Sequence, residues 1–316
     1  MNRTQTLQDV LDYIDDNRTN ALSVAMIADR GGYSAYHFSR IFTEEIDIPV
    51  MSYVTWRRLQ YALYDLSLGK KVIDVAMEYG FETHGGFTKA FVHWFGFPPF
   101  LCRLRLTVHP PTRPNVQMIK NKFLGGNAMS PHIMELTPFP AVGYPTRHRK
   151  EHVNDTIKTP SFWETTGVDY GALLSKLYDT FPKSKHLEIT MCYDLNESTG
   201  EFTYLVGRGI DNPDDLANIR PDMTRVDIAG GLYAIFSTPP AVGSQLSQTI
   251  QDTWNEIFLH WLPQSEFEYD EMRYDFGYHD HREHGWYFDG KEQIDIYIPI
   301  RQREEEVRKS QLRASR

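Results

Sequence analysis

One pattern of apolar and polar positions occurs twice in the first third of the chain. Apolar residues, a glycine and an aromatic residue follow one another in the first copy as Val24, Ile27, Ala28, Gly32 and Tyr33. The same types recur 48 positions later as Val72, Val75, Ala76, Gly80 and Phe81. Helical spacing followed by a glycine that can turn in the left-handed region predicts a short helix, a tight turn and a second helix in each copy.

The second helix of each copy is predicted to bury one face and expose another. The inward positions are Phe38, Ile41 and Phe42 in the first copy and Phe87, Ala90 and Phe91 in the second. The outward positions are Tyr36, Ser39 and Arg40 in the first copy and His84, Thr88 and Lys89 in the second. Hydrogen-bonding side chains with a cation suit the major groove of DNA, so these outward residues are the candidate base-reading set. For one copy alone, a helical hairpin with a solvated polar face is an equal alternative, and the second copy favours DNA binding.

The stretch between the two copies is predicted to be one long helix. Residues 50–68 place apolar side chains at helical spacing, and about 17 residues at 1.5 Å each extend roughly 25 Å. A spacer of that length would hold two reading helices about one turn of DNA apart.

Motifs through the first hundred residues resemble one family. They are Ile27-Ala28-x-x-x-Gly32-Tyr33-Ser34, Phe38-x-Arg40-x-Phe42, Arg58-Leu59-x-x-Ala62, Ile73-x-Val75-Ala76, Gly80-Phe81, Phe87-x-x-x-Phe91 and Phe95-Gly96-Phe97-Pro98-Pro99-Phe100-x-x-Arg103. Residues 7 to about 107 thereby resemble the DNA-binding domain of the AraC/XylS family of transcription regulators. The resemblance implies an all-α domain of seven helices with two helix-turn-helix motifs on double-stranded DNA.

Two departures from that family pattern affect the prediction. Asp47 stands where the family usually has a helix-ending glycine, and aspartate tolerates the left-handed region less well but acceptably. Gly85 and Gly86 open the second reading helix, which lowers its helix propensity and removes two side chains. The first motif is therefore expected to carry more of the sequence readout.

The charge balance does not by itself indicate a nucleic-acid partner. The 316 residues carry a net charge of −9, and residues 1–107 hold 11 Lys/Arg against 12 Asp/Glu. A phosphate-binding face would have to come from the arrangement of cations rather than from their total. The candidate cations are Arg40, Arg57, Arg58, Lys70, Lys71, Lys89, Arg103 and Arg105, with Arg57 and Arg58 added to the predicted DNA-binding residues.

Length and composition predict two domains in a cytoplasmic protein. Two distant cysteines, Cys102 and Cys192, fit a reducing compartment, and no apolar run is long enough for a membrane span or a signal peptide. Neither a cofactor nor a membrane partner is expected. The proline-rich run 109–114 and the glycines at 125–126 predict a linker over 109–130. It would separate a DNA-binding domain at 1–108 from a second domain at 131–300, which a charged tail at 301–316 follows.

The second domain alternates short strands with two helices. Strands are predicted at 133–146, 186–194, 201–208, 231–238, 273–279 and 293–300, and helices at 161–181 and 244–262. Strand–helix–strand–strand, written twice, predicts a multidomain chain whose second half is α+β, with two sheets that leave a cleft between the repeats.

This half resembles the GyrI-like effector-binding domain. The marks are Leu136-x-Pro138-Phe139-Pro140-Ala141-Val142-Gly143, Trp261-Leu262-Pro263-x-Ser265-x-Phe267 and Asp295-Ile296-Tyr297-Ile298-Pro299-Ile300. Together with the first half they resemble the Rob-like regulators, which implies an aromatic pocket for a drug or metabolite. A glutamate that pairs with cationic ligands is often part of that pocket.

The glutamate implied by the resemblance has no counterpart at the expected position. Phe276 stands at that position. Asp275 could take the place of the glutamate only if the strand register slipped by one, which would turn Asp275 to the other face. The candidate ligand-binding residues are Tyr144, Trp163, Trp254, Asp275, Phe276, Tyr278 and Tyr297. For each aromatic residue, plain core packing is the alternative.

The run from His279 to His284 contains three histidines among charged residues, and a solvated loop is preferred over a metal site. The sequence thus predicts a transcription regulator that binds double-stranded DNA specifically and responds to a small hydrophobic or aromatic ligand, with RNA polymerase as a further candidate partner. The alternatives are a GyrI-like small-molecule hydrolase and a regulator whose second half binds another protein.

Overall fold

The chain forms two compact units. The computed structural model describes residues 3–116, 130–149, 169–184, 187–279 and 291–303. The helical unit comprises Met1–Arg103, Val108–Ala128 and Arg303–Arg316, and the sheet unit comprises Leu104–Thr107 and Met129–Gln302.

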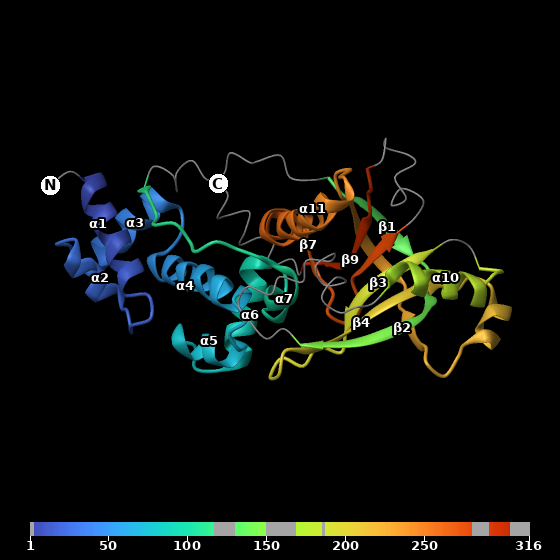
Figure 1. Cartoon of the computed structure of the whole chain (residues 1–316). Coiled ribbons are helices and arrows are strands. Elements are labelled where there is room, and N and C mark those ends of the chain that lie inside the picture. The colour runs from blue at the N-terminus through green and yellow to red at the C-terminus, as the bar shows by residue number, and fades with distance from the viewer. Residues whose placement is uncertain (1–2, 117–129, 150–168, 185–186, 280–290, 304–316) are drawn as a thin grey trace. The chain divides into compact units, whose positions relative to one another are not determined.

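The helical unit is all α in the residues described. Its helices are α1 (Arg3–Asp16), α2 (Val24–Arg30), α3 (Ala35–Ile46), α4 (Val50–Ser67), α5 (Val72–Glu78), α6 (His84–Phe95) and α7 (Phe100–Arg105), of which α7 continues into the sheet unit at Leu104. Figure 1 shows α1 to α3 at one end of α4 and α5 to α7 at the other. The 18 residues of α4 give a spacer about 27 Å long, which confirms the predicted long helix between the two motifs.

Left-handed residues form the predicted turns. Gly32 has φ of 73° and Gly80 has φ of 78°, so both glycines adopt the conformation that a side chain would resist. Asp47 ends α3 with φ of 64°, which confirms that an aspartate occupies the left-handed position here.

Both second helices begin with an oxygen cap. The hydroxyl of Ser34 accepts a hydrogen bond from the backbone N–H of His37 (3.4 Å), and the hydroxyl of Thr83 accepts one from Gly86 (3.0 Å). Each cap satisfies an amide that the first helical turn leaves free. The sequence therefore specifies where α3 and α6 start.

Each of the two motifs has its own apolar cluster. The first gathers α1 to α4 around Phe38, Phe42 and Tyr53, whose rings lie 5.5–5.6 Å apart. The second groups rings from the turn before α6, from α6 and from the segment after it; its members are Phe81, Phe87, Phe91, Phe95 and Phe97. Aromatic pairs at these distances contribute about 0.5–1.5 kcal/mol beyond burial, so each motif is a rigid platform.

The first part of the predicted linker lies against the helical unit. Gln8 on α1 donates to the carbonyl of Pro114 (2.8 Å) and accepts from the N–H of Val116 (3.1 Å). The side chain of Val116 is buried in the α1–α4 cluster. Pro114 and Val116 are thus buried against the helices, while Thr112, Arg113 and Asn115 stay exposed.

The sheet unit is an antiparallel sheet with helices, which confirms the predicted α+β class. Its strands are β1 (His132–Leu136), β2 (Phe139–Arg149), β3 (Glu188–Tyr193), β4 (Glu201–Gly209), β5 (Thr224–Ile228), β6 (Gly231–Ser237), β7 (Phe267–Tyr269), β8 (Phe276–His279) and β9 (Asp295–Gln302). The helices are α10 (Tyr170–Thr180), α11 (Gly243–Glu256), a π-helical turn (Ile257–Trp261) and α12 (Leu262–Gln264), with a 3-10 turn at Pro213–Asn218.

The prediction of two separate sheets is wrong for the described strands. They pair in the order β1-β6-β9-β8-β3-β4-β2-β5, with β7 on β9, so β3 and β8 join the repeats into one sheet. The order is symmetric about the β8–β3 pair. Strands β6, β9 and β8 on one side correspond to β2, β4 and β3 on the other, and the outer strands β1 and β5 correspond to each other. Strands β5 and β7 were not predicted.

The two faces of the sheet differ in what they carry. Along β3, Ile189 and Met191 belong to an apolar cluster that also contains Phe276. The alternate residues point to the opposite face, where Thr190 hydrogen-bonds His279 (2.8 Å). The face with Ile189, Met191 and Phe276 is called the cluster face. The face with Thr190 and His279 is called the helix face, because Trp254 of α11 lies on it.

Candidate functional site

Helix α3 presents the first predicted reading residues outward. Tyr36 is 83% exposed, and the exposed Arg40 lies 3.4 Å from Glu44, one turn along the helix. An exposed pair of this kind contributes little, so Arg40 can exchange Glu44 for another partner. The half-buried Ser39 donates its hydroxyl proton to the carbonyl of Ala35 (2.8 Å), which leaves the oxygen as an acceptor.

Helix α6 presents a thinner set. His84 and Lys89 are exposed, and so are Gly85 and Gly86. The Thr88 hydroxyl is buried, with no hydrogen-bond partner among the described residues. Of the residues predicted to read bases on α6, His84 and Lys89 are therefore the ones whose side chains reach outward.

Arg57, predicted to contact DNA, lies in the interior. It is 3% exposed, and its guanidinium binds both carboxylate oxygens of the buried Asp15, with Nε to Oδ1 at 2.7 Å. It also donates to the carbonyl of Thr112 (3.1 Å). Burial lowers the pKa of Arg57 and the hydrogen-bonded Asp15 raises it, with a net upward shift. Arg57 therefore joins α1, α4 and the segment after α7, and cannot reach a phosphate in this fold.

Arg58 is also engaged inside the helical unit. Its guanidinium donates to the carbonyls of Arg18 (2.8 Å) and Asn20 (2.6 Å), and burial lowers its pKa. A Cβ on Gly80 would come within 3.3 Å of it. Both arginines of the α4 pair thus support the fold, because Arg57 binds α1 and the segment after α7, and Arg58 binds the turn before α2.

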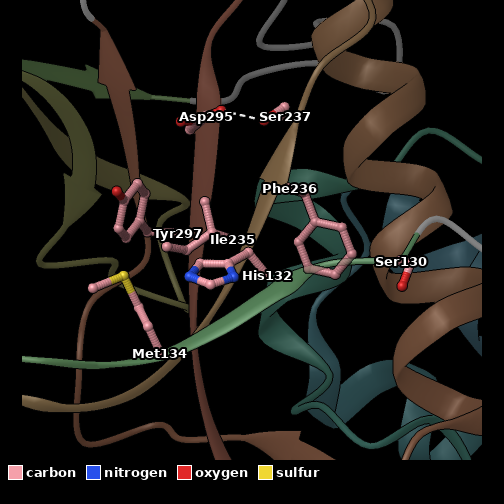
Figure 2. A pocket seen from close by; sticks show the side chains of 8 residues that line it. All are labelled: Ser130, His132, Met134, Ile235, Phe236, Ser237, Asp295 and Tyr297. Carbon is pink, nitrogen blue, oxygen red and sulfur yellow. Dashed lines mark hydrogen bonds between the residues drawn. The ribbon is translucent and has the colours of Figure 1, made fainter.

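A groove opens on the cluster face of the sheet unit. It has a cavity volume of about 500 Å³ and is lined by Ser130, His132, Met134, Ile235, Phe236, Ser237, Asp295 and Tyr297. Figure 2 shows these side chains on β1, β6 and β9, apart from Ser130, which precedes β1. The volume is in the range of small-molecule sites, which combine apolar walls with a few polar groups.

One row of side chains crosses four neighbouring strands at the groove. His132 is paired with Ile235, Ile235 with Tyr297, and Tyr297 with Phe276. The rings of Tyr297 and Phe276 stack at 4.7 Å with an interplanar angle of 15°. Of this row, His132, Ile235 and Tyr297 line the groove, and the buried Phe276 supports the Tyr297 ring from β8.

A carboxylate lies beside Tyr297 in the groove. Asp295 is the strand partner of Tyr278 and lies two residues before Tyr297, on the same face of β9. It accepts a hydrogen bond from Ser237 (2.6 Å), as Figure 2 shows. The sequence analysis missed Asp295, although the period-2 spacing to Tyr297 was the signal that could have found it. An acidic group next to stacked rings suits an organic cation with an aromatic body.

The predicted ligand-binding residues do not form one group. Phe276, Tyr278 and Tyr297 share the cluster face, where Tyr278 and Tyr297 lie at 5.9 Å and 74°. The structure places Trp254 and Asp275 on the opposite face. Tyr144 is buried there too, since its strand partner Val206 pairs with Thr190. Trp163 lies outside the described residues.

Asp275 is engaged by Arg105, a residue expected among the DNA-facing cations. The Arg105 guanidinium donates to both carboxylate oxygens, at 3.1 and 2.8 Å, in the interior of the sheet unit. The register does not slip, so Asp275 lies on the helix face in phase with Gly277 and His279 and does not line the groove. This ion pair removes both residues from their predicted roles.

Within the described ranges, no three His, Cys, Asp or Glu side chains come together as a metal-binding group. His279 is buried against Thr190, and His281 and His284 fall outside those ranges. Among the helices described, none is long and apolar enough to cross a bilayer.

Comparisons with known proteins agree with this division. A helix-turn-helix domain model matches residues 27–103, and the integron-associated effector binding protein family matches residues 132–300, more than half of the chain. The transcriptional activator AarP of Providencia stuartii is 33% identical over 103 residues, which are 32% of this chain and 76% of AarP. The multiple antibiotic resistance protein MarA of Escherichia coli is 30% identical over 100 residues, 31% of this chain and 79% of MarA.

Among solved structures, an integron cassette protein from the mobile metagenome of Vibrio cholerae matches 55% of this chain and 97% of its own, at 18% identity and a TM-score of 0.33. The family match over 132–300 and the AarP and MarA matches carry the assignment. The chain belongs to the integron-associated effector binding proteins and is an AraC-type DNA-binding transcription regulator with a GyrI-like effector-binding domain.

Proposed function

We propose that α3 reads bases in the major groove with Tyr36 and Arg40, and that α6 adds His84 and Lys89 one DNA turn away. The exposure of Arg40 and its weak tie to Glu44 support the first assignment. The length of α4, about 27 Å, supports the spacing. Because α6 opens on two glycines, we expect α3 to contribute most of the sequence specificity.

The DNA assignment can be tested with binding sites selected from a random duplex pool by the full chain. Replacing Arg40 with alanine should weaken binding to the selected site by about 5- to 150-fold, the range for losing one base-reading arginine. Lys89→Ala should cost less, and Arg113→Ala, an exposed cation outside α3 and α6, serves as the control. Unchanged affinity for Arg40→Ala would refute the placement of the reading helix.

We further propose that the effector is a small aromatic cation bound in the groove. The single observation that carries this is that the carboxylate of Asp295 and the ring of Tyr297, which stacks on Phe276, line the same groove. Aromatic faces attract organic cations, and a nearby carboxylate strengthens the attraction by a charge-assisted contact.

Rhodamine 6G, an aromatic cation, is a suitable fluorescent probe of the full chain. Asp295→Asn keeps the shape and removes the charge, so affinity should fall about tenfold or more. The matched control is Asp227→Asn, which neutralises an exposed carboxylate on β5. A neutral dye such as Nile red should bind the two variants alike. Equal binding of rhodamine 6G to wild type and Asp295→Asn would refute the cationic class.

We infer that effector binding alters transcription through DNA binding and RNA polymerase, and that the groove binds its ligand without turning it over. AarP is named a transcriptional activator, which supports regulation rather than catalysis for the AraC-type half. Steady turnover of an electrophilic probe that required Asp295 would contradict the inference.

A further inference from the structure

Arg105 is an arginine buried at the point where the chain enters the sheet unit. It ends helix α7, whose residues up to Arg103 belong to the helical unit, while Leu104–Thr107 belong to the sheet unit. Its side chain is 9% exposed and makes the bidentate contact with Asp275. The guanidinium also lies 4.4 Å above the ring of Trp254 on α11. A carboxylate and an aromatic face together form a built receptor for one cation.

Side chains of α11 hydrogen-bond to the backbone of Arg105 and Thr107. Gln251 donates to the carbonyl of Arg105 (2.8 Å). One turn further along α11, Asn255 accepts from the N–H of Thr107 (3.2 Å) and donates to its carbonyl (3.0 Å). Paired side-chain contacts to both backbone groups are how protein surfaces recognise extended peptides.

Little space is left beside this segment. The cavity that Leu104 and Arg105 line measures about 40 Å³, room for no more than a few waters. Burial lowers the pKa of Arg105 and the Asp275 carboxylate raises it, with a net upward shift, so the guanidinium keeps its charge. Loss of either partner would leave an isolated buried charge, which proteins avoid.

The receptor for Arg105 is connected to the groove through Phe276, which contacts the lining residue Tyr297. Asp275 immediately precedes Phe276, whose ring stacks on Tyr297 from the neighbouring strand β9. The two side chains point to opposite faces of the sheet, so a shift of β8 moves both. A ligand that displaced or tightened the ring stack would change the geometry at Asp275.

We propose that Arg105 is a positioning residue that couples the effector groove to the DNA-binding half. Its ion pair with Asp275, called the lock below, changes in strength with what occupies the groove. The identity of the groove rests on the function proposed above. A ligand can act this way only if it binds the locked and released states with different affinity. Coupling is reciprocal, so breaking the lock must change ligand affinity by the same factor.

Amide hydrogen exchange of the full chain tests the lock without a ligand. Arg105→Met and Asp275→Asn should each speed exchange about tenfold or more at Leu104–Thr107 and also in β8 and β9. The double variant should exchange more slowly than either single variant, since it leaves no unpaired charge buried. The control is Arg147→Met, which removes an exposed ion pair to Asp194 in the same unit. Exchange in α10 reports that the unit stays folded, and Arg105→Lys replaces Arg105→Met if it does not.

Rhodamine 6G affinity completes the test. Arg105→Met should bind the dye with an affinity that differs from wild type about fivefold or more, and Arg147→Met should not. If faster exchange is confined to Leu104–Thr107 and dye affinity is unchanged, Arg105 is only a structural ion pair and the proposal is overturned. If no chain binds the dye but β8 and β9 respond to Arg105→Met, the ligand class proposed for the groove fails and the coupling stands.

Discussion

Replacing Arg57 with methionine separates a structural arginine from a DNA-reading one. Methionine keeps the apolar length of the side chain and removes the guanidinium that binds Asp15. Asp15 is 1% exposed. Of the hydrogen bonds to its carboxylate described here, the one from the hydroxyl of Tyr61 at 3.2 Å would remain. The variant therefore leaves a buried carboxylate short of its counter-charge.

The expected loss of stability follows from that burial. Removing one partner of a buried ion pair costs about 3–5 kcal/mol, whereas an exposed pair contributes about 0–1 kcal/mol. A neighbouring pair provides the comparison, because Arg113 and Asp16 lie 2.7 Å apart with both side chains more than half exposed. Arg57→Met should thus lose several times more stability than Arg113→Met, although the two ion pairs involve adjacent aspartates on α1.

The assay is thermal and urea unfolding of the full chain by circular dichroism, with hydrogen exchange in α1 and α4 to assign the loss to the helical unit. For a unit of about 100 residues, 3 kcal/mol lowers the Tm by roughly 12 °C or more. Asp15→Asn combined with Arg57→Met should recover part of the loss, since no charge is left buried. DNA affinity, measured on folded protein, should change less than in Arg40→Ala.

The opposite pattern would refute the reasoning. If Arg57→Met unfolds within about 1 kcal/mol of wild type and loses DNA affinity as Arg40→Ala does, Arg57 contacts DNA in solution. The ion pair with Asp15 would then contribute no more than a surface pair.

Two further predictions concern single positions. Asp47→Gly should raise the free energy of unfolding by up to about 1 kcal/mol in urea titrations, because glycine adopts the left-handed conformation at φ of 64° without strain, and a loss would contradict this. Burial raises the pKa of Cys192 from 9.0 to about 11, so the folded chain holds the thiol proton more tightly than the unfolded chain does. The stabilising contribution is complete below about pH 9 and disappears as pH rises towards 11; unfolding at pH 8 and 10.5 should show a steeper loss for wild type than for Cys192→Ala, and parallel losses would contradict it.

The sequence by itself determined the elements whose requirements are local. Gly32 and Gly80 fix the turns because only glycine adopts their backbone without strain, and Ser34 and Thr83 fix the helix starts by capping amides within three residues. The alternation of apolar residues likewise predicted most strands of the sheet unit. These features depend on neighbours a few positions away, so they can be seen in a single chain.

The tertiary structure decided which charged residues stay in solvent and which side of the sheet each side chain takes. Arg57 is buried because Asp15 lies 42 positions earlier, and Arg105 because Asp275 lies 170 positions later. Neither partner is marked by any local pattern. Asp295, and not Asp275, reaches the groove because the pairing of β9 with β6 and β8 sets the face of each residue. A charge is stable inside a protein only beside its partner, and long-range folding alone brings such partners together.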